Sequence, residues 1–112
     1  MLNNEMAGGA QKSALIFAAL GDPTRLQLVE KLGDGRPKSI NTLSSDFKLT
    51  RQAITKHLHV LEEVGIVRSE RLGRENRFTM KDGAIKTARD YLDQIGKQWD
   101  DALTRLKLHV EE

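Results

Sequence analysis

Apolar residues recur at steps of three and four along most of the chain, a spacing typical of helices that bury one face. Residues 12–20 (KSALIFAAL) predict a short, largely buried helix that ends at Gly21. A second helix follows, with Asp22 able to cap it and Pro23 suited to its first position. Its predicted buried stripe consists of Leu26, Val29 and Leu32.

The next apolar positions predict two more helices separated by a tight turn. A third, short helix is built on Ile40, Leu43 and Phe47. Thr50 can then cap a helix over about 50–64. At about 100° per residue, the apolar arc of this helix comprises Ala53, Ile54, His57, Leu58, Leu61 and Val64. The opposite arc gathers hydrogen-bonding side chains, namely Arg51, Gln52, Thr55, Lys56 and His59.

Beyond Gly65 the pattern changes to alternation and then returns to helical spacing. Residues 66–72 (IVRSERL) and 77–80 (RFTM) predict two strands joined by a turn at 73–76 (GREN), so that 66–80 form a hairpin. A long helix is expected over 84–110, with a heptad-like apolar seam of Ile85, Ala88, Leu92, Ile95, Trp99, Ala102, Leu106 and Val110. This seam is either a core strip within one chain or a dimer interface. Trp99 favours the interface, because a large ring on a terminal helix needs deep cover.

Composition limits the class of protein. The chain has 112 residues, which fits one domain, and its 38% hydrophobic content with five aromatic residues makes a small core. The absence of cysteine excludes disulfides, thiol catalysis and Cys-ligated metals, and it suits the cytoplasm. No apolar run is long enough for a membrane span. Residues 1–11 are expected to form a loose tail that precedes one domain over 12–110.

Charge is unevenly distributed along the chain. Residues 36–81 hold ten Lys or Arg and five acidic residues, a net charge of +5, whereas the remainder carries −3 and the whole chain +2. A basic middle between acidic flanks is consistent with a surface that meets a polyanion. A solvated, charge-rich surface would give the same composition.

The predicted helix over 50–64 has the division that a DNA-reading helix requires. A helix about 10–12 Å across fits the major groove of duplex DNA, about 12 Å wide. Its apolar back would hold it on the protein, and its polar front would face base edges. We therefore predict that bases are read by Gln52, Thr55, Lys56 and His59, with Arg51 on base or phosphate. Thr50 and Lys38 are candidate phosphate contacts, and the hairpin would add Arg71, Arg74 and Arg77, unless these arginines are only a solvated edge that deters strand pairing.

At these residues the sequence also resembles a family, the ArsR/SmtB bacterial winged helix-turn-helix repressors. The phrases DPTR (22–25), KHLHVLEEVGIV (56–67) and GRE (73–75) are similar to the family's wording, and the resemblance covers about residues 14–110. It implies a homodimer in which the first and last helices pair, so Leu15 joins the seam residues as a predicted interface residue. It further implies repression of a promoter by binding an inverted repeat, relieved by an effector of unknown identity.

The sequence departs from the metal-sensing members of that family. Where they carry a pair of cysteines, the matching positions are Ser39 and Asn41, which are poor ligands for soft metals. Where they carry Asp-x-His-x10-His-x-x-Glu, the pattern begins at Asp82 and then meets Ala84, Ile95 and Gln98. We therefore expect no metal site and no cofactor.

The predicted fold is mainly α with a β-hairpin wing, a winged helix-turn-helix with a helical dimer interface. We predict a sequence-specific repressor that binds double-stranded DNA as a homodimer and is not an enzyme, since no catalytic constellation is evident. Two alternatives stay open: a winged-helix module that binds another protein, and a metal-responsive repressor with a non-standard site. His57, on the apolar arc, is expected to be a buried, hydrogen-bonded core residue.

Overall fold

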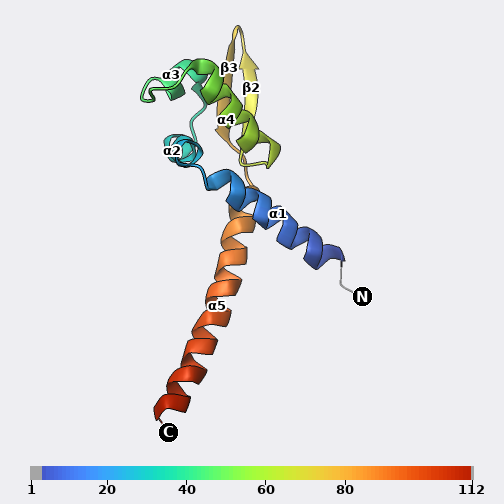
Figure 1. Cartoon of the computed structure of the whole chain (residues 1–112). Coiled ribbons are helices and arrows are strands. Elements are labelled where there is room, and N and C mark those ends of the chain that lie inside the picture. The colour runs from blue at the N-terminus through green and yellow to red at the C-terminus, as the bar shows by residue number, and fades with distance from the viewer. Residues whose placement is uncertain (1–3, 112) are drawn as a thin grey trace.

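The computed structural model describes the backbone of residues 4–111 and the side chains of residues 9–110. Within that range the chain folds into helices and three short strands (Figure 1). In chain order these elements are α1 (Asn4–Leu20), α2 (Pro23–Leu32), β1 (Lys38–Ser39), α3 (Ile40–Ser44), α4 (Arg51–Glu63), β2 (Val67–Leu72), β3 (Glu75–Met80) and α5 (Ala84–Glu111). The order confirms the predicted winged helix-turn-helix architecture.

Side-chain caps set the starts of the central helices. The Asp22 carboxylate accepts a hydrogen bond from the backbone N–H of Arg25 at 3.0 Å, and Pro23 occupies the first turn of α2. Thr50 Oγ1 accepts from the backbone N–H of Ala53 at 3.0 Å and caps α4 in the same way. Both caps agree with the sequence prediction.

The first helix is longer than predicted. It begins at Asn4, so residues 4–11 are helical where a loose tail was expected, and residues 1–3 lie outside the described residues. Helix elongation costs little once a nucleus exists, and this segment contains good helix formers such as Ala, Met, Glu and Gln. The two glycines in this segment therefore do not interrupt the helix.

Three details of the central region also differ from the prediction. In α2 the core residues are Leu28 and Leu32, both fully buried, whereas Leu26 is 46% exposed. Helix α3 ends at Ser44, so Phe47 packs against the core from the loop that follows. The two-residue strand β1 was not predicted at all.

The strands form one antiparallel sheet in the order β1-β3-β2. Strands β2 and β3 make the hairpin, with Val67 opposite Met80 and Leu72 opposite Glu75, while β1 pairs with the other edge of β3. The hairpin turn is Gly73–Arg74, and Gly73 has a φ of +65°, a conformation that glycine adopts without strain. Predicted and observed hairpin limits agree within two residues.

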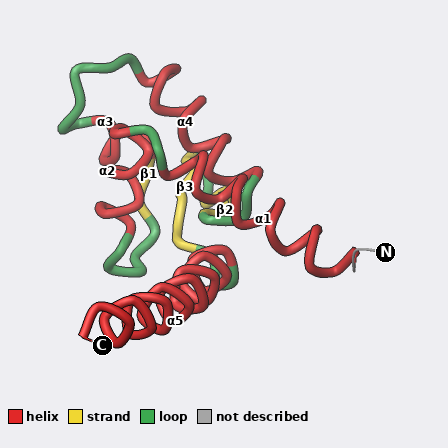
Figure 2. Tube along the Cα trace, turned by 60° about the horizontal axis from the view of Figure 1, so that its bottom comes forward, coloured by secondary structure: helices red, strands yellow, loops and turns green. Residues whose placement is uncertain are grey.

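A small core joins α2, α3, α4 and the sheet into a compact head. Its fully buried side chains are those of Leu28, Leu32, Leu43, Ile54, Leu58, Leu61 and Ile66, with Val67 and Phe78 almost fully buried. The helices α1 and α5 leave this head in different directions (Figures 1 and 2). Among the described residues, none of the helices combines the length and apolar character that a membrane crossing requires.

The whole chain is far from spherical. Its radius of gyration is 18.4 Å and its extents are 67 × 34 × 21 Å. A compact chain of this length would have a radius of gyration of about 13 Å. The excess comes from α5, a helix of 28 residues that packs against α1 only near its beginning. Most of α5 therefore has no intramolecular cover.

Candidate nucleic-acid interface

The helix α4 separates a buried back from an open polar front. Its back inserts Ile54, Leu58 and Leu61 into the core, each with no exposed surface. The front carries the predicted polar arc, which borders one open hollow on the surface and consists of Arg51, Gln52, Thr55, Lys56 and His59. All of these side chains except the half-buried Thr55 are exposed. The structure thus brings the five predicted helix residues together on one face.

The hydroxyl of Thr55 is already used within the helix. Thr55 Oγ1 donates to the backbone carbonyl of Arg51 at 2.7 Å, one turn earlier. The side chain can still accept a hydrogen bond and can offer its methyl group to another apolar group. Thr55 is therefore suited to accepting from a base amino group or touching a thymine methyl, and it is not a free donor.

The back of α4 is tied to α1 and α2 through one histidine. His57 Nδ1 lies 3.3 Å from Arg25 Nη1 and 3.8 Å from Asp22 Oδ2, and Arg25 Nε donates to the carbonyl of Ala19 at 2.7 Å. The Arg25 backbone N–H, with smaller help from the charge of His57, holds the pKa of the Asp22 carboxyl below its usual value. The predicted hydrogen bonding of His57 is confirmed, but the predicted burial is wrong, because the side chain keeps 24% of its surface exposed.

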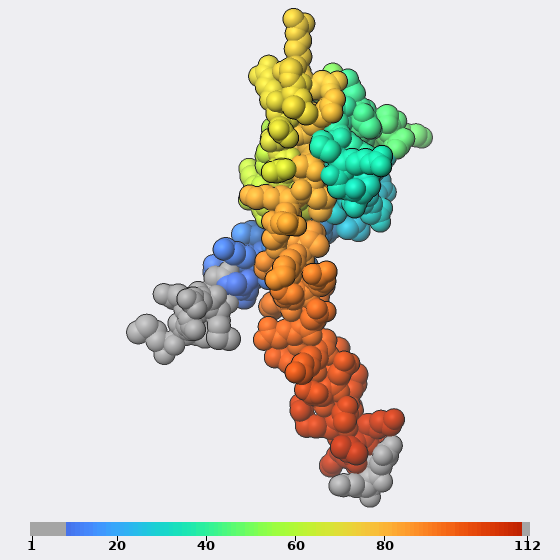
Figure 3. Space-filling view, turned by 180° about the vertical axis from the view of Figure 1, so that it is seen from behind, coloured from blue at the N-terminus to red at the C-terminus, as the bar shows by residue number. Residues whose placement is uncertain are grey.

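The hairpin presents its arginines in different directions. Arg71 lies opposite Asn76 and Arg77 lies opposite Glu70, and paired residues share a face, so Arg71 and Arg77 are on opposite faces of the ribbon. Arg74 is in the turn, which projects as a narrow tip from the end of the molecule remote from the C-terminal part of α5 (Figure 3). Arg77 Nε is 3.3 Å from a carboxylate oxygen of Glu75. The three predicted arginines therefore surround the tip and do not form one flat basic surface.

A depression of about 230 Å³ joins the hairpin tip to the start of α4. Arg74 and Asn76 of the hairpin border it on one side, and Arg51 and Asn41 border it on the other. The sequence did not single out either asparagine as a binding residue. Only the packing of the hairpin beside α3 reveals them, because the two asparagines lie far apart along the chain.

Lys38 is not brought to this face as a free cation. Its ammonium donates to both carboxylate oxygens of Asp34, at 2.7 and 2.8 Å, and to the carbonyl of Lys31 at 2.6 Å. The Lys38 ammonium is also the main cause of the lowered pKa of the Asp34 carboxyl. The side chain is committed to the turn before β1, and its predicted role as a phosphate contact stays a prediction that these contacts do not support.

The predicted interface residues fall into two groups. Ala88 is 5% exposed and Ile85 packs against the core, so both belong to the core of the chain itself. The other large side chains of the seam are exposed, as follows: Leu15 60%, Leu92 54%, Ile95 41%, Trp99 65% and Leu106 60%. Ala102 lies half-buried between them.

Two further side chains extend the exposed seam of α5. Tyr91, whose ring packs against that of Phe17 in a tilted arrangement at a centroid distance of 6.1 Å, and Leu103, 50% exposed, lie on the same side of the helix. A 3.6-residue period read around Trp99 would have found both. Sequence reasoning missed them because a strict heptad count passes over these positions.

No group of three or more His, Asp or Glu side chains suited to holding a metal ion occurs among the residues whose side chains the structure describes. Ser39, one of the two residues at the positions of the cysteine pair of metal-sensing relatives, has a structural contact instead. Ser39 caps α3, with its hydroxyl accepting from the backbone N–H of Thr42 at 3.2 Å.

Known proteins resemble this chain in sequence and in structure. A family model described as a helix-turn-helix domain matches residues 20–70. The HTH-type transcriptional regulator Rv2034 of Mycobacterium tuberculosis is 31% identical over 88 residues, 79% of this chain and 78% of that protein. A transcriptional repressor SmtB homolog of Synechocystis is 29% identical over 76 residues, covering 68% of this chain and 57% of the relative. The solved structure of an ArsR-like transcriptional regulator from Rhodococcus sp. RHA1 superposes with a TM-score of 0.76, at 35% identity, over 89% of this chain and 93% of that one.

Proposed function

Since this chain belongs to the ArsR/SmtB family of winged helix-turn-helix transcriptional regulators, we propose that it is a repressor that binds an inverted-repeat operator as a homodimer. The observation that carries this proposal is the front of α4. Five hydrogen-bonding side chains lie together there, four of them exposed and Thr55 half-buried, on a helix whose back inserts Ile54, Leu58 and Leu61 fully into the core. Such a face can enter the major groove without disturbing the fold.

Within the groove, each side chain of α4 is suited to a particular contact. Gln52 can pair with adenine, and Arg51 and Lys56 can donate to guanine or to phosphate. Thr55 accepts from a base amino group or meets a thymine methyl, and His59 contacts a base near the middle of the helix. Thr50, which caps α4, lies at the helix N-terminus, where a phosphate is favoured.

The hairpin acts as the wing. Arg74 at its tip, with Arg71 and Arg77 on its two faces, would lie along the adjacent backbone or minor groove, where both faces of a ribbon meet phosphates. Asn41 and Asn76 extend the contact between the wing and α4. We leave Lys38 out of the interface because Asp34 already holds its charge.

The exposed seam of α5 supplies the argument for a homodimer. Its apolar side chains have no cover in a single chain, and water-exposed apolar patches of this kind mark association surfaces. A two-fold axis through α5, with Leu15 of α1 at the edge, would bury the seam against itself. The same axis would hold two α4 helices about 34 Å apart, one turn of DNA, or a multiple of that distance.

Binding of duplex DNA from upstream of the protein's own gene tests this proposal. Fluorescence anisotropy should show one dimer per site and strong competition only by duplexes that keep the inverted repeat. If the dimer neutralises about six phosphates, affinity should fall about 10³-fold between 50 and 200 mM salt. Equal affinity for shuffled DNA, or a flat salt response, would contradict the proposal and favour a module that binds another protein.

A further inference from the structure

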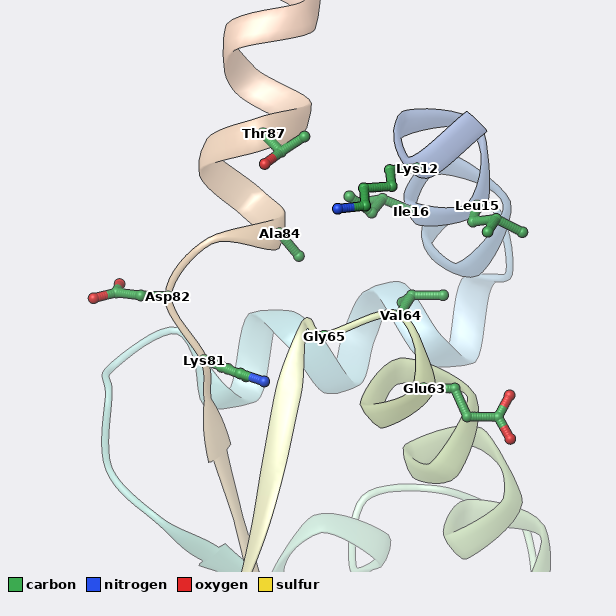
Figure 4. A pocket seen from close by; sticks show the side chains of 10 residues that line it. All are labelled: Lys12, Leu15, Ile16, Glu63, Val64, Gly65, Lys81, Asp82, Ala84 and Thr87. Atoms are coloured by element: carbon green, nitrogen blue, oxygen red, sulfur yellow. The ribbon is translucent and has the colours of Figure 1, made fainter. Parts of the chain in front are cut away.

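A cleft of about 370 Å³ lies where α1, the end of α4 and the start of α5 meet (Figure 4). It is remote from the polar front of α4, because only Glu63, the last residue of that helix, and the two residues that follow it border the cleft. Its apolar lining comes from Leu15 and Ile16 of α1, Val64 and Ala84. The volume lies within the range of pockets that hold small organic ligands.

Two ammonium groups point into this cleft. Figure 4 shows Lys12 reaching from α1 toward α5, and Lys81 reaching from the end of β3 toward the same space. The two carboxylates at the rim, those of Glu63 and Asp82, point away from the cleft. The space between the walls is therefore positively charged.

Neither lysine has an ion-pair partner in the part of the chain whose side chains the structure describes. Among the side chains that the structure describes, the ion pairs involve other lysines and arginines, and Lys12 and Lys81 take part in none. The backbone N–H of Lys81 donates to the carbonyl of Ile66 at 2.9 Å, which fixes the main chain at this point, while the side chain is exposed. Two ammonium groups beside apolar walls are a feature that an anionic ligand with an apolar body can use.

We propose that this cleft binds a small organic monoanion with an apolar body, such as a medium-chain carboxylate. The carboxylate would lie between the Lys12 and Lys81 ammonium groups, and the hydrocarbon would lie along Leu15, Ile16, Val64 and Ala84. Charge-assisted hydrogen bonds from two ammonium groups fix the acidic end, and burial of the apolar chain supplies further affinity. A dianion such as inorganic phosphate would leave the apolar walls uncovered and should bind less tightly.

The position of the cleft connects the ligand to DNA affinity, an extension that rests on the function proposed above. The ligand would touch α1 and α5, which carry the proposed dimer seam, and the end of α4, which carries the reading face. A ligand that prefers one arrangement of these helices would change the distance between the two α4 helices of the proposed dimer. Its negative charge also lowers the attraction to DNA, so the ligand should weaken operator binding, by about 5- to 150-fold for coupling of ordinary size.

Calorimetric titration of the full chain with octanoate tests the site without DNA. Octanoate should bind one equivalent per chain, whereas the neutral octanamide and inorganic phosphate should bind at least about tenfold more weakly. The double variant Lys12→Gln, Lys81→Gln keeps both aliphatic stems and should lose about tenfold or more in octanoate affinity. The matched control is Lys86→Gln, Lys97→Gln, which removes the same charge from exposed positions of α5 outside the cleft and should bind like the parent.

Each outcome decides a different point. Absence of octanoate binding by the parent, or equal loss in the two double variants, overturns the site. Binding that leaves operator affinity unchanged in an anisotropy assay overturns only the link to DNA. Failure of the ligand-free protein to bind any operator, with octanoate binding intact, overturns the proposed function and leaves the site standing.

Discussion

His57 shows how a single side chain links α4 to the rest of the molecule. Its Nδ1 lies 3.3 Å from Arg25 Nη1 and 3.8 Å from Asp22 Oδ2, and Arg25 also donates to the last turn of α1 through the carbonyl of Ala19. Three helices thus meet in one polar network directly beneath α4. These contacts join α4 to α1 and α2.

The loss of folding stability at acidic pH should depend in part on Asp22. Its folded pKa lies below its unfolded value, mainly because the Arg25 backbone N–H donates to it. Its contribution is therefore present above the unfolded pKa, about 3.9, and is lost as pH falls through the lower folded pKa. In Asp22→Asn, which retains a good cap, the unfolding free energy should fall less between pH 7 and pH 3 than in the parent.

Urea unfolding followed by circular dichroism at the two pH values measures this difference. Asp101→Asn, at an exposed position of α5, serves as the control and should keep the parent's loss of stability at acidic pH. If Asp22→Asn loses as much stability on acidification as the parent does, the contacts of the Asp22 carboxylate do not contribute to the pH dependence of stability.

At the reading face, Gln52 should specify one base pair in each half-site. Gln52→Ala should weaken binding to the preferred operator by about 1–3 kcal/mol per base pair read and remove the preference at that base pair only. Gln27→Ala makes the same chemical change at an exposed position of α2 and should leave binding intact. Fluorescence anisotropy with operators changed one base pair at a time gives the comparison. If Gln52→Ala keeps the parent's preference at every base pair, Gln52 does not contact a base.

At the scale of elements, the wing should position the protein without reading sequence. Arg74→Ala at the tip of the hairpin should weaken binding to all duplexes alike and reduce the slope of log affinity against log salt by about 1 for each phosphate that the variant no longer neutralises. Arg105→Ala removes the same charge from the far part of α5 and should change neither quantity. A weakening confined to one operator sequence would instead make Arg74 a base-reading residue.

The elements that local sequence determines were predicted correctly. Thr50 and Asp22 cap α4 and α2 through contacts three residues ahead, and the two arcs of α4 follow from periodicity alone. The polar front predicted for α4 coincides with the surface hollow that the structure forms. All of these features depend on residues within one or two helical turns of each other.

The elements that distant packing determines were not predictable in this way. In α2, Leu26 and Leu28 are both apolar, and only the packing of α2 against α1, α4 and β3 decides that Leu28 is buried. Strand β1 has two residues and exists because β3, about forty positions later, offers an open edge. The same limit applies to the depression between Asn41 and Asn76, whose two sides come from separate elements.

At the scale of the whole molecule, a single chain leaves a large apolar surface of α5 exposed to water. The head is compact, while α5 extends away from it with an apolar seam in water (Figures 1 and 3). A protein of this size has little core to offset the exposure of so many large apolar side chains. Association through α5 would correct this and would also give two reading heads a fixed spacing, so fold stability and operator recognition would depend on the same surface.

Two leucines of α5 allow this dependence to be tested with matched variants. Leu92, 54% exposed, lies on the seam, and Leu108, 58% exposed, lies about 160° around the helix from it. Leu92→Glu would place two carboxylates in the apolar interface of a two-fold dimer, so the variant should sediment as a monomer. Its operator affinity should fall about 10²-fold or more, because the second half-site is no longer bound by a linked subunit. Leu108→Glu makes the same substitution on the opposite side of α5, so this variant should sediment as a dimer and bind operator like the parent. Monomers in both variants, or dimers in both, would show that the seam of α5 is not the surface that joins the subunits.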